Sequence, residues 1–343
     1  MRSFAPGRVN LIGDHTDYLG GLVLPVATPQ GTTVTGAEIE ARVVLESAQL
    51  GGRVDLALPL SGAPELPPWG RFVAAVVGEV FDGSPSHGVE GVISSDLPIG
   101  AGLSSSASLE VSLALSLGWR GSPRDLAERC RRAEVRAVGV PCGIMDQLVV
   151  VAARAGHAML LDCASTTWNH VAIPEDLEIL VVDSGQARRL EGSEYAVRRR
   201  QAEEAAVRIR GDGVDPERGP FRGLDPGDAS AAGDPVLVAR ARHHITENLR
   251  VELLAAALTA GDPVGAGRLM SESHRSLAAD YEVSTPTLDR LVADLEALPG
   301  VYGARLTGAG FGGCAVALAA RGTADTSLPP RSWVVAPSAG ALG

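Results

Sequence analysis

A glycine- and serine-rich loop between an expected strand and an expected helix constrains the fold of this chain most. The stretch GVEGVISSDLPIG, residues 88–100, predicts a strand that runs into a glycine loop, and SLEVSLALSLGW, residues 108–119, predicts a helix. A helix N-terminus presents unpaired backbone N–H groups, and glycines let a ligand approach the backbone closely. The stretch LPIGAGLSSSASLE carries three consecutive serines where helix capping needs one. We therefore favour phosphate binding over capping alone.

The chain contains no lysine, because all 30 of its basic residues are arginine. This excludes Schiff-base chemistry and the lysine of a P-loop nucleotide site. Any phosphate chemistry then has to use arginine, backbone N–H groups and a metal ion. The formal charge of −11 argues against binding to nucleic acid or to anionic membranes, since both depend on clustered positive charge.

Length and composition predict a folded chain of two domains in the cytoplasm. The 343 residues are 45% hydrophobic, and 41 Gly and 22 Pro are too few for a disordered chain. The first residues, MRSFAPGRVN, lack the apolar core of a signal peptide, and no apolar run is long enough for a transmembrane helix. The four cysteines show no metal-ligand spacing and predict reduced thiols; they are Cys130, Cys142, Cys163 and Cys314.

Further patterns predict a mixture of strands and helices without internal repeats. Strands are expected at residues 32–39, 41–48, 53–58, 157–163 and 177–185. Helices are expected at residues 70–81, 123–138, 193–210, 243–260 and 285–298, and residues 211–235 are expected to be mostly loop. Ion pairs one helical turn apart are expected within 193–210; they join Arg199 to Glu203 and Arg200 to Glu204.

Two further motifs favour structural interpretations. TGAGFGG, residues 307–313, matches GxGxxG, but CAVALAA follows it and predicts a strand instead of the helix that a dinucleotide site requires. A glycine turn that closes over a ligand or packs two elements together is the better interpretation. The pattern His243-His244 with Glu247 lacks the HExxH arrangement of a metal site, so these residues are expected on the helix surface or in the core.

GRVNLIGDHTDYLGG, residues 7–21, crowds a cation, two carboxylates and an imidazole into ten positions. These side chains are Arg8, Asp14, His15 and Asp17. Asp146 in PCGIMDQ and Glu134 in the preceding helix are further acidic candidates, but spacing alone assigns neither of them a catalytic role.

Three motifs in order resemble the signatures of the GHMP kinase superfamily, which includes galactokinase, homoserine kinase, mevalonate kinase and phosphomevalonate kinase. They are APGRVNLIGDHTDYLGG, LPIGAGLSSSASLE and LTGAGFGGCAVAL. The first motif resembles the galactokinase family, since mevalonate kinases usually carry a lysine where Arg8 stands. CRRAEVRAVGVPCGIMDQ and DSGQARRLEGSEYAVRRRQAEEA also resemble galactokinase segments. The similarity runs from about residue 5 to 318.

The resemblance implies an α+β fold of two domains, residues 1–176 and 177–343, with the active site in the cleft between them. It implies an ATP- and Mg²⁺-dependent sugar 1-kinase, a monomer that forms α-D-galactose 1-phosphate. Asp146 corresponds to the catalytic aspartate that takes the proton from the anomeric hydroxyl, and Arg8 to the arginine that stabilises the developing charge. Whether the aspartate acts as a full base or mainly by electrostatics and orientation stays open.

The same resemblance implies the remaining site residues. The sugar contacts correspond to Asp14, His15, Asp17, Gly143 and Tyr195. The Mg²⁺ ligands correspond to Ser106 and Glu134, and an aromatic position near the adenine to Trp69. The phosphate loop corresponds to Gly100, Ala101, Gly102, Leu103, Ser104, Ser105 and Ser106.

Four departures from the family pattern keep alternatives open. Galactokinases usually carry glutamate at Asp14, asparagine at Leu19 and often histidine at Arg188, and most have a longer N-terminus. Shortening glutamate to aspartate withdraws the carboxylate by roughly 1.5 Å, enough to break a direct hydrogen bond. Since this residue is expected near the sugar's C6 hydroxyl, a related kinase for arabinose, N-acetylgalactosamine or a uronic acid is an alternative. A non-catalytic sugar sensor is another, although the serine loop and Asp146 are intact.

Overall fold

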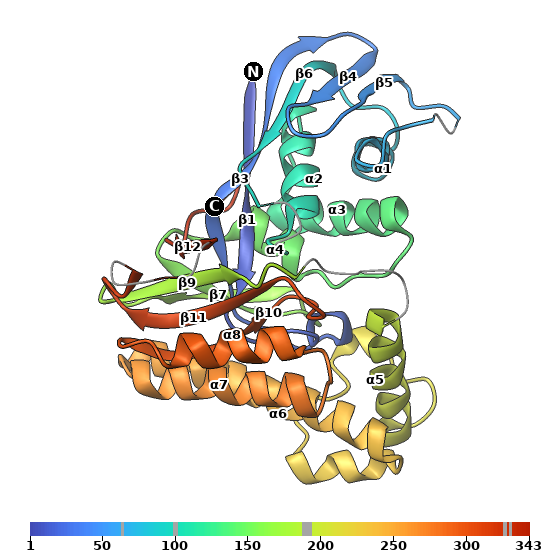
Figure 1. Cartoon of the computed structure of the whole chain (residues 1–343). Coiled ribbons are helices and arrows are strands. Elements are labelled where there is room, and N and C mark those ends of the chain that lie inside the picture. The colour runs from blue at the N-terminus through green and yellow to red at the C-terminus, as the bar shows by residue number, and fades with distance from the viewer. Residues whose placement is uncertain (63–64, 99–101, 187–193, 325–327, 329–330) are drawn as a thin grey trace.

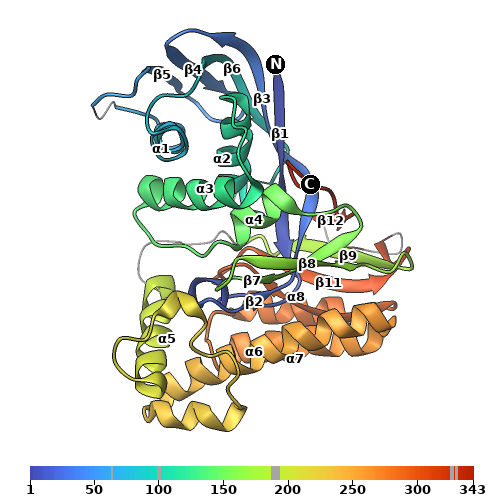
Figure 2. The same ribbon diagram turned by 180° about the vertical axis from the view of Figure 1, so that it is seen from behind.

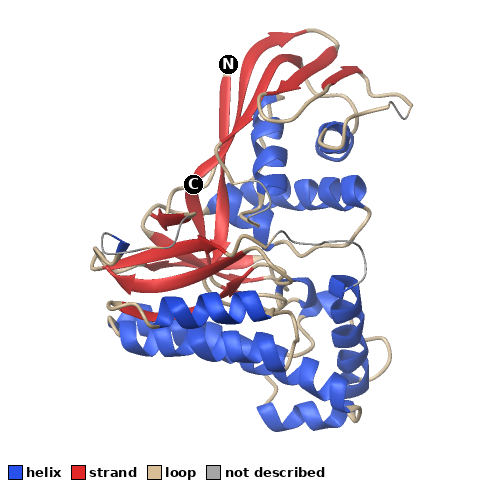
Figure 3. Ribbon diagram, viewed as in Figure 1, coloured by secondary structure: helices blue, strands red, loops and turns tan. Residues whose placement is uncertain are grey.

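The computed structural model describes residues 1–62, 65–98, 102–186, 194–324, 328 and 331–343 (Figure 1). Gly100, Ala101 and Arg188 therefore lie outside the described residues. The described part of the chain mixes sheets and helices, as Figure 3 shows, and the predicted α+β class is confirmed. No helix in this part is both long and apolar enough to cross a membrane.

The first sheet lies in the N-terminal half of the chain. Its strand order is β1-β3-β6-β4-β5, and only β4 and β6 pair in parallel. The strands span β1 (Arg2–Asn10), β3 (Pro25–Ile39), β4 (Arg42–Ser47), β5 (Arg53–Ala57) and β6 (Gly88–Ser95). Four helices pack together beside this sheet (Figure 1). They are α1 (Gly70–Phe81), α2 (Ser105–Ser116), α3 (Pro123–Val138) and α4 (Met145–Ala152).

Local sequence signals explain these helices. The valines of α1 that repeat at helical spacing, Val73, Val76, Val77 and Val80, are all buried. Helix α3 begins after Ser122, whose hydroxyl accepts a hydrogen bond from the Asp125 N–H, and it ends before Gly139 in the left-handed conformation. The predictions for 70–81 and 123–138 are confirmed, whereas the helix expected at 108–119 already begins within the serine run.

The C-terminal half contains a second, fully antiparallel sheet of order β10-β11-β9-β12. Its strands span β9 (Leu177–Asp183), β10 (Val301–Thr307), β11 (Cys314–Ala320) and β12 (Ser332–Val335). The helices of this half are α5 (Glu194–Arg210), α6 (Pro235–Ala260), α7 (Pro263–Ala279) and α8 (Pro286–Glu296). Short 3-10 helices span Asp17–Leu19, Pro216–Arg218 and Pro226–Ala232. The strand predicted after the glycine motif is confirmed as β11, which agrees with the rejection of a dinucleotide site.

Two sequence predictions need correction, and two helices lie where none was predicted. Helix α6 begins at Pro235 and not at residue 243, because Asp234 caps its first turn. Helices α4 and α7 were not predicted. In α5 the Arg199–Glu203 pair forms at 2.7 Å, but Glu204 pairs with Arg208 at 2.6 Å instead of Arg200. His243, His244 and Glu247 were expected on the helix surface or in the core, and all three are buried.

The two halves of the sequence interlock instead of packing as separate bodies. A small sheet, β2-β7-β8, lies between them (Figure 2) and spans Leu22–Val23, His157–Asp162 and Thr167–Ala172. One hydrophobic cluster joins Val9 and Leu11 near the end of β1 to Val251 of α6 and Leu269 of α7. The division into 1–176 and 177–343 therefore stays a prediction.

The C-terminal residues return to the N-terminal half and bond to the end of α4. The backbone N–H groups of Gly340, Ala341 and Leu342 donate to the carbonyls of Ala153, Val150 and Val151 at 2.8–2.9 Å. The last carbonyls of a helix have no partner within it. The C-terminal segment supplies those partners and so fixes the helix that carries Asp146.

Candidate active site

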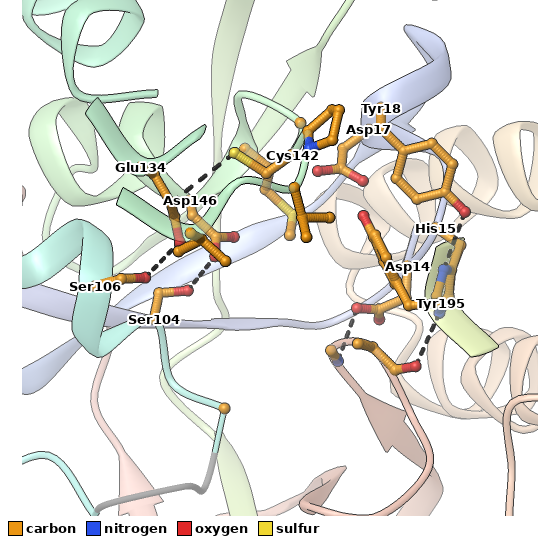
Figure 4. A pocket seen from close by; sticks show the side chains of 18 of the residues that line it. Asp14, His15, Asp17, Tyr18, Ser104, Ser106, Glu134, Cys142, Asp146 and Tyr195 are labelled. Carbon is orange, nitrogen blue, oxygen red and sulfur yellow. Dashed lines mark hydrogen bonds between the residues drawn. The ribbon is translucent and has the colours of Figure 1, made fainter. Parts of the chain in front are cut away.

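A pocket of about 430 Å³ lies where the two halves of the sequence meet. Its walls come from the first motif, the serine loop, the α3–α4 region, the start of α5 and the glycine turn before β11. Figure 4 shows the acidic and hydroxyl side chains gathered around it. The predicted residues in the pocket wall are Arg8, Asp14, His15, Asp17, Gly102, Ser104, Ser105, Ser106, Glu134, Gly143, Asp146 and Tyr195.

A two-pronged ion pair between Arg8 and Asp146 joins β1 to the first turn of α4. The Arg8 Nε donates to Asp146 Oδ1 and Nη2 donates to Oδ2, each at 2.7 Å. The third nitrogen, Nη1, donates to the Gly102 carbonyl at 2.6 Å. Burial alone lowers the pKa of Arg8, but the charge and hydrogen bonds of Asp146, together with the charges of Asp14 and Asp17, outweigh burial and raise that pKa above the ordinary value. Arg8 is therefore a permanent cation 6% exposed to solvent.

The chain before Arg8 brings β1 against the serine loop. The Arg8 N–H donates to the Leu103 carbonyl at 3.1 Å, and the β1–β3 register shifts between Pro6 and Arg8. A Cβ on Gly7 would lie 2.6 Å from the Leu103 oxygen. Glycine is required at this position because β1 and the loop approach so closely.

The serine loop leads directly into α2, whose first residue is Ser105. The Ser106 hydroxyl donates to Glu134 Oε1 at 2.7 Å, and the Gln147 amide donates to Glu134 Oε2 at 2.5 Å. Burial, followed by the charge of Asp146, raises the pKa of Glu134. The described residues include no group of three or more His, Cys, Asp or Glu that could hold a metal ion.

The first motif is tied to the glycine turn at the far end of the sequence. Asp14 Oδ2 accepts a hydrogen bond from Arg305 Nη1 at 2.5 Å, and Oδ1 accepts one from the Gly308 N–H at 2.8 Å. Arg305 is fully buried and Asp14 is 2% exposed. His15 Nε2 lies 3.2 Å from the Ala309 carbonyl oxygen. These contacts hold the motif and the glycine turn on one side of the pocket.

Asp17 lies against Gly143, in the loop before α4. A Cβ on Gly143 would lie 1.9 Å from Asp17 Oδ2, so a larger residue there would displace the carboxylate. Burial and then the nearby charge of Asp146 raise the pKa of Asp17 to about 7. Two acidic groups that face one pocket thus repel each other unless a ligand or a proton intervenes.

Aromatic rings form the wall next to His15. The ring centroids of His15 and Tyr195 are 5.7 Å apart, and those of Tyr18 and Tyr195 are 5.6 Å apart. The Tyr18 hydroxyl lies 3.1 Å from His15 Nδ1 and 2.6 Å from the Tyr281 hydroxyl. Burial, followed by the charge of Asp17, raises the pKa of Tyr195 well above its ordinary value, so this phenol stays protonated.

Two predicted residues lie away from the pocket wall. Trp69 is 7% exposed in the core beside α1, and its indole N–H donates to the Gly51 carbonyl at 3.0 Å. Leu103 is buried in a hydrophobic cluster and contributes its carbonyl to Arg8. Sequence reasoning missed Tyr18, although it stands within the first motif, and it assigned no individual residue to the glycine turn. That turn supplies Gly308, Ala309 and Phe311.

Family models match three parts of the chain. The galactokinase galactose-binding signature matches residues 1–38, the GHMP kinases N terminal domain residues 71–154, and the GHMP kinases C terminal model residues 254–326. The mevalonate kinase of Methanococcus jannaschii is similar in structure, with a TM-score of 0.63 at 19% identity over 95% of this chain and 92% of that chain. The fold and the site therefore define a GHMP kinase.

Relatives with higher sequence identity show which family of GHMP kinases the chain resembles. Human galactokinase is 42% identical over 92% of this chain and 82% of that protein, and galactokinase of Roseiflexus sp. (strain RS-1) is 42% identical over 94% and 84%. The structure of Lactococcus lactis galactokinase complexed with galactose superimposes with a TM-score of 0.90 at 30% identity, covering 99% of this chain and 94% of that one. The chain belongs to the galactokinase family.

The raised pKa of Asp17 predicts a pH-dependent stability cost. A carboxyl whose pKa rises from 3.8 to about 7 on folding costs stability progressively between about pH 4 and pH 7. We expect Asp17→Asn to be more stable than the wild-type protein at pH 8 by up to about 4 kcal/mol, the free-energy equivalent of a shift of about three pKa units. The difference should shrink toward zero near pH 4, where the folded protein holds Asp17 in its neutral form.

Urea unfolding at pH 4 and pH 8, followed by circular dichroism, measures this difference. Asp212→Asn, at an exposed loop position, is the matched control and should change stability little at either pH. Equal stability of Asp17→Asn and wild type at pH 8 would contradict the assigned burial of this charge.

Proposed function

We propose that the protein transfers the terminal phosphoryl group of ATP to the anomeric hydroxyl of D-galactose and forms α-D-galactose 1-phosphate. The observation that carries the proposal is the Arg8–Asp146 pair in a pocket that also contains the first motif. Family membership supports the substrate, since the relatives are galactokinases and one solved relative is a complex with galactose. These relatives do not favour the alternative sugars.

Asp146 has the chemistry to orient the sugar hydroxyl and accept its proton. A carboxylate offers about four lone-pair directions, and among the described residues Oδ1 accepts a hydrogen bond from Arg8 Nε. An acceptor direction at Oδ1 is thus free for the hydroxyl. The Arg8 guanidinium compensates negative charge that develops at the attacking oxygen and the transferring phosphoryl group.

ATP would bind with its phosphates along the loop from Gly100 to Ser106. The N-terminus of α2 directs unpaired N–H groups and the positive end of the helix dipole toward this loop. Because the chain has no lysine, Arg8 and these N–H groups are the protein's counter-charges there. Contact between Trp69 and adenine stays a prediction. The Trp69 indole packs in the hydrophobic core instead of lining the pocket described above.

Ser106 and Glu134 fit a magnesium ion. Mg²⁺ prefers hard oxygen donors and in kinases is commonly held by one or two carboxylates together with substrate phosphates. The hydroxyl and the carboxylate lie 2.7 Å apart, and Glu134 has a raised pKa that a nearby cation would lower. Bound there, Mg²⁺ would neutralise phosphate charge while Ser106 and Glu134 hold it beside the loop.

The sugar would contact Asp14, His15, Asp17, Gly143 and Tyr195. Acids and an imidazole that are wholly or partly removed from water discriminate well between sugars, because a missing or inverted hydroxyl leaves one of them unpaired. Arg305 and Gly308 already occupy one direction on each Asp14 oxygen, so Asp14 meets the sugar in a fixed orientation. We further propose a cytoplasmic monomer without nucleic-acid or membrane partners, in keeping with the acidic charge and the four free cysteines.

A sugar panel tests the substrate. We expect kcat/KM for D-galactose to exceed that for arabinose, N-acetylgalactosamine and galacturonate by at least about tenfold, because each lost or added group disturbs a buried polar contact. ADP release in a coupled assay measures the rates. A kcat/KM higher for a sugar altered at C6 than for D-galactose would contradict the proposal. Asp14 would then be the first residue to test as the cause of the changed preference at C6.

Replacement of Asp146 tests the reactive group. Asp146→Ala should lower kcat at least about a thousandfold, because the hydroxyl loses its oriented acceptor. Binding of a non-hydrolysable ATP analogue, measured by calorimetry, should change less than about threefold. Asp176→Ala, at an exposed position before β9, is the control and should keep wild-type kcat. Near-normal kcat in Asp146→Ala would refute the assigned role.

A further inference from the structure

Ser104 has a backbone conformation that helix formation does not explain. It precedes α2 with φ 56° and ψ 50°, in the left-handed region, and it is 8% exposed. Residues that cap a helix N-terminus normally have extended backbone and accept a hydrogen bond through the side chain. Ser104 makes no such side-chain cap. Glycine would adopt this conformation more easily than any L-amino acid. The presence of serine at this position therefore indicates a role for its side chain.

The Ser104 hydroxyl donates to Asp146 Oδ2, as Figure 4 shows. The same oxygen accepts a hydrogen bond from Arg8 Nη2 at 2.7 Å, while Oδ1 accepts one from Arg8 Nε. The carboxylate is thus held from two sides, by a residue of β1 and by a residue of the serine loop. The two parallel hydrogen bonds from Arg8 fix the plane of the Asp146 carboxylate. The Ser104 hydroxyl adds a third hydrogen bond, which opposes movement of the carboxylate away from the Arg8 guanidinium.

The hydroxyl also connects the catalytic group to the phosphate loop. Ser104 is followed by Ser105, the first residue of α2, and by Ser106, which contacts Glu134. The Arg8 Nη1 donates to Gly102 in the same loop. A shift of the loop therefore moves Ser104, and with it the orientation of Asp146.

We propose that Ser104 is a positioning residue, whose hydroxyl fixes the Asp146 carboxylate relative to the loop before α2. This assignment rests on the phosphoryl transfer proposed above. In this account the side chain acts on Asp146, and only the backbone of Ser104 faces the phosphates. The left-handed conformation persists because it points the hydroxyl toward Asp146.

Two substitutions separate the side chain from the backbone. Ser104→Gly removes the hydroxyl and suits the left-handed backbone, whereas Ser104→Ala removes the hydroxyl and keeps the unfavourable conformation. If the hydroxyl positions Asp146, both variants lose kcat by about 10- to 100-fold, the range expected for a lost hydrogen bond to a charged group. The KM values for ATP and galactose should stay within about threefold.

A purely structural role predicts a different pattern. It would make activity follow stability, so Ser104→Gly would match the wild-type protein while Ser104→Ala would not. Ala41→Gly is the matched control, because Ala41 is exposed, lies between β3 and β4, and also has a positive φ of 52°. This control should change the melting temperature without changing kcat.

Steady-state kinetics and thermal melting distinguish a positioning role of the Ser104 hydroxyl from a purely structural one. They are measured on the wild-type protein and on the variants Ser104→Gly, Ser104→Ala and Ala41→Gly. A loss of kcat in Ser104→Gly, with both KM values retained and a melting temperature at or above that of Ser104→Ala, supports the proposal. Wild-type kcat in Ser104→Gly, or a tenfold rise in the KM for ATP with kcat retained, overturns it. If the wild-type protein phosphorylates no sugar at all, the proposed function fails, and this outcome is distinct from a failure of the Ser104 assignment.

Discussion

The buried ion pair between Arg8 and Asp146 is the interaction on which the rest of the site depends. Arg8 is 6% exposed, and a cation removed from water in this way is costly unless its N–H groups are paired. The two Asp146 oxygens and the Gly102 carbonyl supply that pairing. Because Arg8, Gly102 and Asp146 belong to three separate segments, these contacts fix β1, the serine loop and α4 relative to one another.

The surrounding structure supports this pair at a distance. Gly7 permits the close approach of β1 to the loop, and the C-terminal residues complete the hydrogen bonding of α4 at its far end. On the opposite side of the pocket, the Asp14–Arg305 pair ties the first motif to the glycine turn. The pocket is therefore formed by contacts between residues hundreds of positions apart, and its shape depends on both halves of the chain.

The sequence predicted the elements with clear local signals. The valine spacing of α1 and the serine, proline and glycine signals of α3 are local, and both helices begin and end where they were expected. The short helix α4 follows a proline, a cysteine and a glycine and has few such signals, so it was missed. Helix α6 was predicted too short, because its cap, Asp234, and its first residue, Pro235, end a stretch rich in Gly, Asp and Pro that was assigned to a loop.

The local sequence pattern alone was not enough to assign roles to the residues of the pocket. Asp146 and Glu134 look ordinary in the sequence, and their importance comes from Arg8 and Ser106, which lie far away along the chain but adjacent in space. The resemblance to the kinase superfamily supplied those assignments. It could not supply the contact between Ser104 and Asp146 or the core position of Trp69, since both depend on how this chain packs.

Phosphorus NMR of the product formed from ATP and D-galactose in the presence of Mg²⁺ tests whether the protein phosphorylates the anomeric oxygen of the sugar. We expect a sugar phosphate whose phosphorus couples to the anomeric proton of the α-anomer, together with ADP. Phosphate on the C6 oxygen, or ADP and free inorganic phosphate without a sugar phosphate, would contradict it.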